Sequence, residues 1–222
     1  MARSRGRPAL ADRAQIDEAA AELFLEQGYE ATSVDDIARR AGVARSSFFN
    51  RAASKADLLW TSVDHWLDVA ERELLGGSGV EEMALERIAS LCDRIPDEDK
   101  PWAIVHRDAM GTRDALLAGV GPRLARYEQL LVCLFGGTST ANTTRARVLM
   151  AVVATRLAGE RWVSGNGVPL GVHLREVCRE LGLADLGGTT GDNFCRAEDN
   201  ALPDGAGSPR SDGFRRYLQG RR

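Results

Sequence analysis

A run of basic residues with no acidic residue among them lies near the N-terminus of this 222-residue chain. Between positions 37 and 56 the charged residues are Arg39, Arg40, Arg45, Arg51 and Lys55. Such side chains bind phosphate groups, and arginine also pairs with base edges in DNA. The net charge of the chain is −3, so a local basic surface on an otherwise acidic protein favours binding to one kind of DNA site. A solvated helix face is the alternative interpretation.

The residues before this run have the apolar spacing of a helix. A first helix is predicted to begin at Asp12, because Asp12 and Gln15 resemble a capping box. Its apolar residues recur at spacings of three and four, and Gly28 supplies the left-handed residue that commonly ends a helix. The predicted buried stripe consists of Ile16, Ala19, Ala20, Leu23 and Phe24.

A helix-turn-helix pattern follows. Thr32 and Ser33 offer an N-cap for a second helix, and Asp35 and Asp36 occupy its first turn, where the helix dipole favours negative charge. Gly42 permits a tight turn, and residues 44 to about 50 are predicted to form a third helix. The basic run therefore falls on the second and third helices and on the residues that follow them.

The rest of the chain also has helical spacing. A second capping box at Ser54 to Asp57 begins one long connecting helix, predicted over residues 54–75, and the glycines from Gly76 to Gly79 end it. Turn-forming Gly and Pro residues separate further helices, predicted over residues 81–94, 101–110, 112–117, 122–135, 145–163 and 168–183. No segment alternates like a strand, so we predict an all-α fold with a three-helix head and a helical bundle.

Both ends of the chain differ in composition from the middle. Residues 187–222 contain few apolar side chains and are predicted to be a disordered tail, although residues 214–218 could dock on another surface. At the other end, Arg3, Arg5 and Arg7 could reach a minor groove as a flexible arm, or could serve only as a soluble terminus.

Residues 16–59 resemble the DNA-binding region of the TetR/AcrR family of transcriptional regulators. Three motifs carry the resemblance: I-x-x-A-A-x-x-L-F-x-x-x-G-Y from Ile16, T-S-V-D-D-I-A-R-R-A-G-V from Thr32, and S-K-x-x-L-L from Ser54. Composition predicts a basic arm over residues 1–11 and a tail over 187–222. The resemblance implies a DNA-binding domain over 12–60 and an effector-binding and dimerisation domain over 61–186. It also implies a homodimer that pairs through helices 145–163 and 168–183.

In this family the third helix enters the major groove of an operator, usually a palindromic one. By matching motif position, the residues expected at double-stranded DNA are Thr32, Ser33, Arg45, Ser46, Ser47, Phe49, Asn50, Arg51 and Lys55. Two positions depart from the family pattern. Phe49 replaces a tyrosine whose hydroxyl touches phosphate, and Ala52 replaces a core aromatic, which would loosen the junction after the third helix unless Phe48, Phe49 or Trp60 fills the space.

The helical bundle is expected to hold a small hydrophobic or amphipathic effector. Candidate contacts are the aromatic, soft or polar side chains within aliphatic helices, which line many pockets for apolar molecules but are also common in plain cores. These residues are Trp66, Trp102, His106, Met110, Tyr127, Cys133 and Trp162. The resemblance implies a repressor that the effector releases from DNA, with the long helix over residues 54–75 coupling the two events.

Other classes of protein are less well supported by the sequence. The chain contains no G-x-S-x-G, H-E-x-x-H or phosphate-loop motif, so we expect no catalytic residue and no cofactor. Its four cysteines form no C-x-x-C pair, and no metal site is expected. No apolar run approaches a membrane span and no secretory signal is evident, so we expect a cytoplasmic protein. The alternatives are a DNA-binding protein whose body binds a protein partner, and a helical enzyme.

Overall fold

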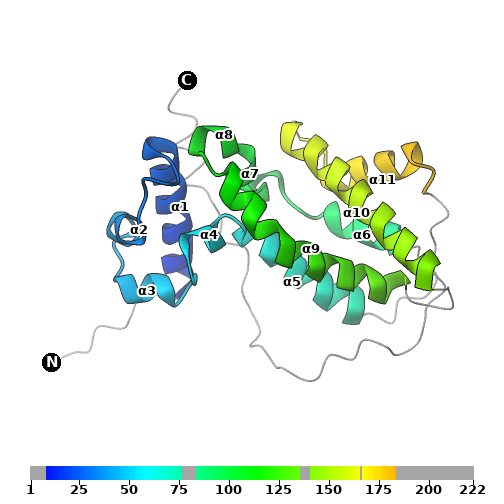
Figure 1. Ribbon diagram of the computed structural model, residues 1–222, viewed down its shortest axis with the longest axis horizontal. Helices are drawn as coiled ribbons and strands as arrows, with labels where there is room; N and C mark the ends of the chain where they lie inside the picture. The colour runs from blue at the N-terminus through cyan, green and yellow to red at the C-terminus, as the bar shows by residue number, and fades with distance from the viewer. Residues whose placement is uncertain (1–8, 77–83, 136–140, 166, 184–222) are drawn as a thin grey trace. The chain divides into compact units, whose positions relative to one another are not determined.

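The computed structural model describes residues 9–76, 84–135, 141–165 and 167–183. All regular structure in these residues is helical, as the all-α prediction required (Figure 1). None of the described helices is both long and apolar enough to cross a bilayer. The helices are α1 (Ala9–Gln27), α2 (Val34–Ala41), α3 (Arg45–Phe49), α4 (Lys55–Leu58), α5 (Thr61–Gly76), α6 (Ala84–Cys92), the 3₁₀ turn η1 (Asp97–Asp99), α7 (Trp102–Val105), α8 (Arg107–Met110), α9 (Arg113–Phe135), α10 (Ala141–Ser164) and α11 (Leu170–Glu180).

The described chain forms two compact units. The head unit comprises residues 9–61 and 102–119, and the body unit comprises the described residues of 62–101 and 120–183. The first crossing between the two units lies at residues 61/62. The head unit, however, also contains residues 102–119, which the sequence had assigned to the effector-binding domain. The predicted functional division of the chain remains a prediction.

Packing against α1 explains why residues 102–119 belong to the head unit. The backbone N–H of Tyr29, just after α1, donates to the Met110 carbonyl at 2.7 Å. The Phe24 ring contacts the rings of Tyr29 and Trp102, with centroid distances of 5.0 and 6.0 Å. Met110 is itself completely buried. These apolar contacts bury surface that α1 to α3 alone would leave exposed to water.

The start of α1 differs from the prediction. The helix begins at Ala9, whereas the capping box predicted a start at Asp12. The sequence Ala9-Leu10-Ala11 has high intrinsic helix propensity, so the helix continues toward the N-terminus past the predicted cap. The predicted arm residues Arg3, Arg5 and Arg7 lie outside the described residues, as do most of the glycines at 76–79 and all of the predicted tail at 187–222.

The prediction of one long helix over residues 54–75 is wrong, because the chain turns between α4 and α5. The N–H groups of Leu59 and Trp60 bond to the carbonyls three residues earlier, those of Ala56 and Asp57, at 3.2 and 3.1 Å. Leu58, Leu59 and Trp60 are all buried. Three consecutive side chains on a straight α-helix point in different directions, so the tighter turn allows all three to reach the core.

A second correction concerns α9, which is continuous where two helices were predicted on either side of residues 118–121. Pro122 lies inside it. Proline removes one backbone hydrogen bond, but Ala118 and Pro122 are both exposed, so water can satisfy the lost partner. Gly119 permits a close approach, because a Cβ there would lie 2.5 Å from Nε1 of Trp60. Pro122 is therefore tolerated inside the helix because it is exposed to solvent, and Gly119 is required by close packing against Trp60.

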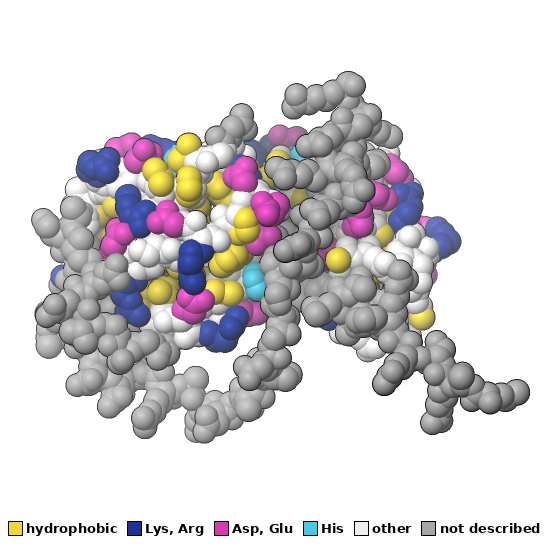
Figure 2. Space-filling view, turned by 180° about the vertical axis from the view of Figure 1, so that it is seen from behind, with side chains coloured by type: hydrophobic (Ala, Val, Ile, Leu, Met, Phe, Trp, Pro, Cys, Tyr) yellow, Lys and Arg dark blue, Asp and Glu magenta, His cyan; other side chains and the backbone are white. Residues whose placement is uncertain are grey.

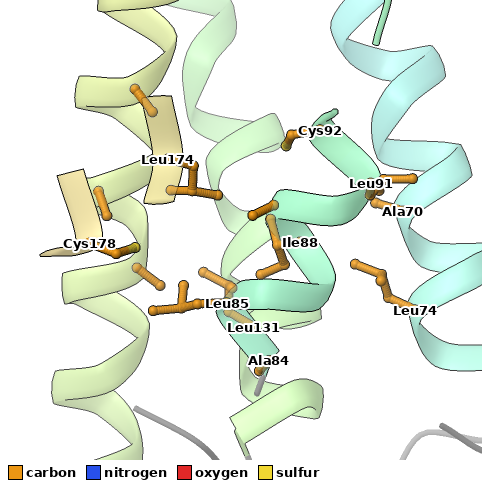
Figure 3. Packing of buried hydrophobic residues seen from close by; sticks show 14 of the residues in the cluster. Ala70, Leu74, Ala84, Leu85, Ile88, Leu91, Cys92, Leu131, Leu174 and Cys178 are labelled. Atoms are coloured by element: carbon orange, nitrogen blue, oxygen red, sulfur yellow. The ribbon is translucent and has the colours of Figure 1, made fainter. Parts of the chain in front are cut away.

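The body unit has one large apolar core around α6 (Figure 3). Leu85 and Ile88 of α6 lie between Leu74 of α5 and Leu174 of α11, and Leu131 of α9 adds to the same cluster. The α11 helix comes very close to α6 at Gly171, where a Cβ would overlap the Ala89 carbonyl. The two helices found at 141–164 and 170–180 correspond to those predicted at 145–163 and 168–183.

Ion pairs between helices surround this core. Arg123 and Arg126 of α9 pair with carboxylates of α5, those of Asp64 for Arg123 and of Asp68 and Glu71 for Arg126. Arg175 of α11 donates to Glu86 and Asp93 from the α6 segment. The hydrogen bonds from the Arg175 guanidinium hold the pKa of Glu86 below its usual value. Each pair joins two helices that are distant in sequence, so they favour one arrangement of the body.

Candidate nucleic-acid interface

The second helix of the helix-turn-helix begins after Ser33, one of the two predicted N-cap residues, which forms a capping box with Asp36. The backbone N–H of Asp36 donates to the Ser33 hydroxyl, and the N–H of Ser33 donates to the Asp36 carboxylate, both at 3.1 Å. Hydrogen bonds from the Ser33 hydroxyl, its backbone N–H and the Arg39 guanidinium lower the pKa of Asp36. The box determines where α2 starts and hence the phase of its buried residues Ile37 and Ala38.

The turn and the third helix also match the predicted pattern. Gly42 has φ of 66°, a left-handed conformation that glycine adopts without strain. The next residue, Val43, donates its N–H to the Ala38 carbonyl at 3.0 Å and closes the turn. In α3 the Phe48 side chain is completely buried and anchors the helix. The side chains on the opposite side of α3 are therefore held outward from a well-packed core.

The side chains predicted to face bases lie on this outer side or beside it. Arg45, Ser46 and Asn50 are exposed, while Ser47 and Arg51 are half-buried. Phe49 is 46% exposed, and its ring packs edge-on against Phe48 with centroids 5.4 Å apart. Phe49 therefore does not fill the core next to the buried Ala52. The outer side of α3 combines a cation, hydroxyls, an amide and an aromatic ring, and these groups suit base and phosphate contacts.

The basic run is less uniformly positive than the sequence suggested. Arg45 pairs with Asp35, and Arg39 pairs with Asp36. Arg40 donates to both Glu22 and Glu26 of α1. On the face shown in Figure 2, basic and acidic side chains lie next to each other across the described surface. Acidic residues outside positions 37–56 thus neutralise part of the field, and the spacing of Glu22 and Glu26 on one turn of α1 was the available signal.

Three of the residues expected at DNA, Thr32, Ser33 and Lys55, form hydrogen bonds within the head. Thr32 is only 2% exposed, and its hydroxyl donates to the Gly28 carbonyl at 2.8 Å. The Lys55 ammonium donates to the carbonyls of Tyr29 and Thr32 at 2.8 and 3.1 Å and lies over the Tyr29 ring. Ser33 forms the capping box described above. The bonds of Thr32 and Lys55 hold the loop between α1 and α2 against the start of α4, while Ser33 remains exposed at the start of α2.

The predicted effector residues divide between the two units. Trp102, His106 and Met110 belong to the head unit, whereas Trp66, Tyr127, Cys133 and Trp162 belong to the body unit. Burial lowers the pKa of His106. Since Trp102 and Met110 pack with residues of α1 and its end, their burial is explained by the head core. The structure therefore does not gather the seven residues in one unit.

Within the body unit, three of the four remaining residues share one cluster. Trp162 belongs to the apolar core, and Trp66 and Tyr127 pack against it. The Tyr127 hydroxyl forms a 2.7 Å hydrogen bond with the Thr155 hydroxyl, and burial raises the pKa of Tyr127. The Trp66 indole N–H donates to the Asp99 carboxylate at 3.2 Å. Cys133 lies half-buried on α9. Trp66, Tyr127 and Trp162 therefore all contribute to the packing of the body core, and their role as effector contacts stays a prediction.

Known proteins resemble both the helix-turn-helix and the longer chain. Residues 16–60 match the family model described as bacterial regulatory proteins, tetR family. Over 163 residues the chain is 23% identical to the HTH-type transcriptional activator FasR of Mycolicibacterium smegmatis, and the match covers 71% of this chain and 74% of FasR. It is 39% identical over 62 residues to the HTH-type transcriptional regulator HbdR of Aromatoleum sp. (strain CIB), covering 28% of this chain and 27% of HbdR.

A solved structure resembles the chain over most of its length. It is that of Thermus thermophilus FadR, described as a TetR family transcriptional repressor in complex with lauroyl-CoA. The two chains are 21% identical, with a TM-score of 0.44 and coverage of 87% of this chain and 100% of FadR. The family match falls on the capped helix, the glycine turn and the outward-facing α3 described above. The helix-turn-helix at residues 16–60 therefore matches the tetR family of bacterial regulatory proteins.

Proposed function

We propose that the chain is a cytoplasmic, ligand-responsive repressor that binds an inverted-repeat operator as a homodimer. The observation that carries this proposal is the outer side of α3, where Arg45, Ser46, Phe49 and Asn50 are exposed above the buried Phe48. A short helix with such side chains, positioned by a preceding helix and turn, has the geometry that reads a major groove. We retain Ser47 and Arg51 as contacts, and assign Thr32, Ser33 and Lys55 to positioning of the interface.

The DNA-binding part of the proposal is tested by selecting bound sequences from randomised duplexes with the purified protein. We expect an inverted repeat to be enriched, because a two-fold dimer presents two α3 helices to two half-sites. Replacing Arg45 or Arg51 with alanine should weaken binding to that sequence about tenfold or more, measured at one fixed salt concentration because phosphate contacts are salt-dependent.

A matched control is Arg113→Ala. Arg113 is also an exposed arginine paired with an aspartate, Asp108, but it lies in α9, outside the helix-turn-helix. This substitution should leave operator binding unchanged. Equal losses with all three variants would point to a general effect of charge, and the absence of any enriched sequence at low salt would refute DNA reading by α3.

An exposed apolar stripe on α10 supports the homodimer. Leu149, Met150, Val153 and Leu157 are 37 to 51% exposed and recur at spacings that place them on one side of the helix. On α11, Val172 is also partly exposed. An apolar face of this kind, left over after the body core has formed, is suited to the same face of a second copy, as in a symmetric isologous interface.

For the effector we propose an apolar or amphipathic molecule bound in the body unit near Trp66, Tyr127 and Trp162. Trp162 belongs to the body core and Trp66 and Tyr127 pack against that core, whereas Trp102, His106 and Met110 belong to the head unit. The effector would favour a conformation that binds DNA weakly, and by linkage DNA would weaken effector binding by the same factor. The chain crosses between the units at residues 61/62, 101/102 and 119/120, so α5 and α9 as well as the 101/102 connection are candidates for transmitting the change.

The effector proposal is tested with a panel of fatty acids, steroids and planar aromatic compounds. A true effector should raise the melting temperature of the protein and release the selected operator at the same concentration. Tyr127→Phe removes only the hydroxyl bonded to Thr155, so we expect it to weaken the response to a polar-headed effector while operator binding by the free protein is retained. Release that is unchanged in this variant would exclude the Tyr127 hydroxyl as a contact.

A protein partner for the body is the competing interpretation. It would be favoured if no compound in the panel changed operator binding and a specific protein bound the body unit instead. The direction of regulation follows from reporter expression with the operator placed over a promoter, where a repressor lowers expression because it blocks access by the polymerase.

A further inference from the structure

The guanidinium of Arg45 is held from two directions on the outer side of α3. The Asp35 carboxylate, in the first turn of α2, accepts a hydrogen bond from it. Its Cζ atom lies 5.4 Å from the centroid of the Phe49 ring, one turn further along α3. Phe49 in turn packs edge-on against the fully buried Phe48. A long and flexible side chain is therefore restrained by an ion pair and by a cation–π contact.

These contacts contribute little to the stability of the fold. The side chains of Arg45 and Asp35 are 60% and 58% exposed, and exposed ion pairs of this kind are screened by water. The Asp35 carboxylate also has a cost for DNA binding, because it places a negative charge beside the surface that must approach phosphates. Arg40 differs, because it pairs with two carboxylates, those of Glu22 and Glu26 on α1, and its side chain is only 36% exposed.

We propose that Asp35 is a positioning residue for sequence specificity, which acts by holding Arg45, against Phe49, in an orientation that reads the edge of a guanine. This inference rests on the proposed function, in which α3 enters the major groove. Bidentate pairing of arginine with guanine requires one defined orientation of the guanidinium plane, whereas a mobile arginine can reach many phosphate oxygens. A restrained arginine loses less conformational freedom when it binds the correct base. The nearby carboxylate disfavours contact between this arginine and a phosphate group, because the phosphate is also negatively charged. Asp35 thus lowers affinity for random DNA more than affinity for the operator.

The test compares Asp35→Asn, Arg45→Ala and the double variant of the full chain with the wild type. For each protein, affinity is measured for the selected operator and for a random duplex of equal length at the same salt concentration. In the wild-type background, Asp35→Asn should lower the ratio of the two affinities about tenfold, chiefly through tighter binding to the random duplex. In the Arg45→Ala background, the same substitution should leave the ratio unchanged, because Asp35 acts through Arg45.

Two further variants separate the position of the carboxylate from its charge. Asp108→Asn removes a carboxylate from the exposed Asp108–Arg113 pair of the head unit and should not alter the ratio. Asp35→Glu retains the charge and should restore most of the specificity that Asp35→Asn loses. Melting temperatures of all variants verify that the head remains folded.

The outcomes distinguish this inference from the proposed function. If Asp35→Asn changed the ratio equally with and without Arg45, Asp35 would act only as a bulk charge and the inference would be overturned. An unchanged ratio in Asp35→Asn, with an operator clearly bound by the wild type, would overturn it as well and leave the proposed function intact. A wild-type protein that enriches no sequence would overturn both.

Discussion

Replacing both Val153 and Leu157 with glutamate is expected to convert the proposed dimer into a monomer and to reduce operator affinity at least about hundredfold. Both residues lie on the exposed apolar stripe of α10. In a two-fold interface each substitution appears twice, so like charges face each other where apolar surface would otherwise be buried. A monomer binds one half-site at a time and loses the gain from simultaneous binding of two, which amounts to roughly 10² to 10⁴ in affinity.

Light scattering gives the mass of the protein in solution, and titration of the selected inverted repeat gives its affinity. Leu117→Glu is the matched control, because Leu117 is the most exposed large apolar residue of α9 and lies outside the stripe. This control should remain dimeric and bind the operator normally. A double variant that is still dimeric would show that α10 does not form the interface.

Gly171→Ala is expected to destabilise the body unit by about 2 to 3 kcal/mol, the cost of overpacking a tight contact between helices. A Cβ at Gly171 would overlap the backbone carbonyl oxygen of Ala89 and the carboxylate of Asp93. The carbonyl belongs to α6 and cannot rotate away. Asp93 also accepts a hydrogen bond from Arg175 at 2.7 Å. Either α11 must move away from α6, or this ion pair must be broken.

The matched control Gly159→Ala separates the cost of close packing from the general effect of placing alanine in a helix. Gly159 lies inside α10, and a Cβ there would meet no other atom within 4 Å. Alanine has the higher helix propensity, so this substitution should stabilise the protein by up to about 1 kcal/mol. Urea unfolding at one protein concentration, chosen because dimerisation affects apparent stability, gives both values. Similar midpoints for the two variants would contradict the close packing of α6 and α11.

The DNA-binding head could be predicted from sequence because its signals are local. Ser33 and Asp36 form a capping box only three residues apart, and Gly42 needs only its own backbone conformation to make the turn. The outward direction of Arg45 and Asn50 follows from the burial of Phe48 within the same short helix. Family resemblance strengthens each of these signals, because it sets the positions of all three helices together.

Other features depend on residues that meet only after folding. The neutralisation of Arg40 requires Glu22 and Glu26, which are 18 and 14 residues away. The restraint on Arg45 similarly comes from Asp35 in another helix, where the sequence indicated only a favourable interaction with the helix dipole. Gly119 suggested a helix end, yet it permits Trp60 to approach α9. In each case the type of the residue was known from the sequence, but the residue that it contacts could not be predicted from the sequence.

The helical class and the helix-turn-helix could be predicted from local signals, because capping, apolar spacing and turn residues act over a few positions. Three features became visible only in the folded chain: residues 102–119 pack with the head, Trp66, Tyr127 and Trp162 lie in or against the body core, and charges on the head are paired. These results depend on the distance between segments that are far apart in the chain. Apolar burial and ion pairing bring such segments together in the folded chain. Helical periodicity alone does not specify which segments meet.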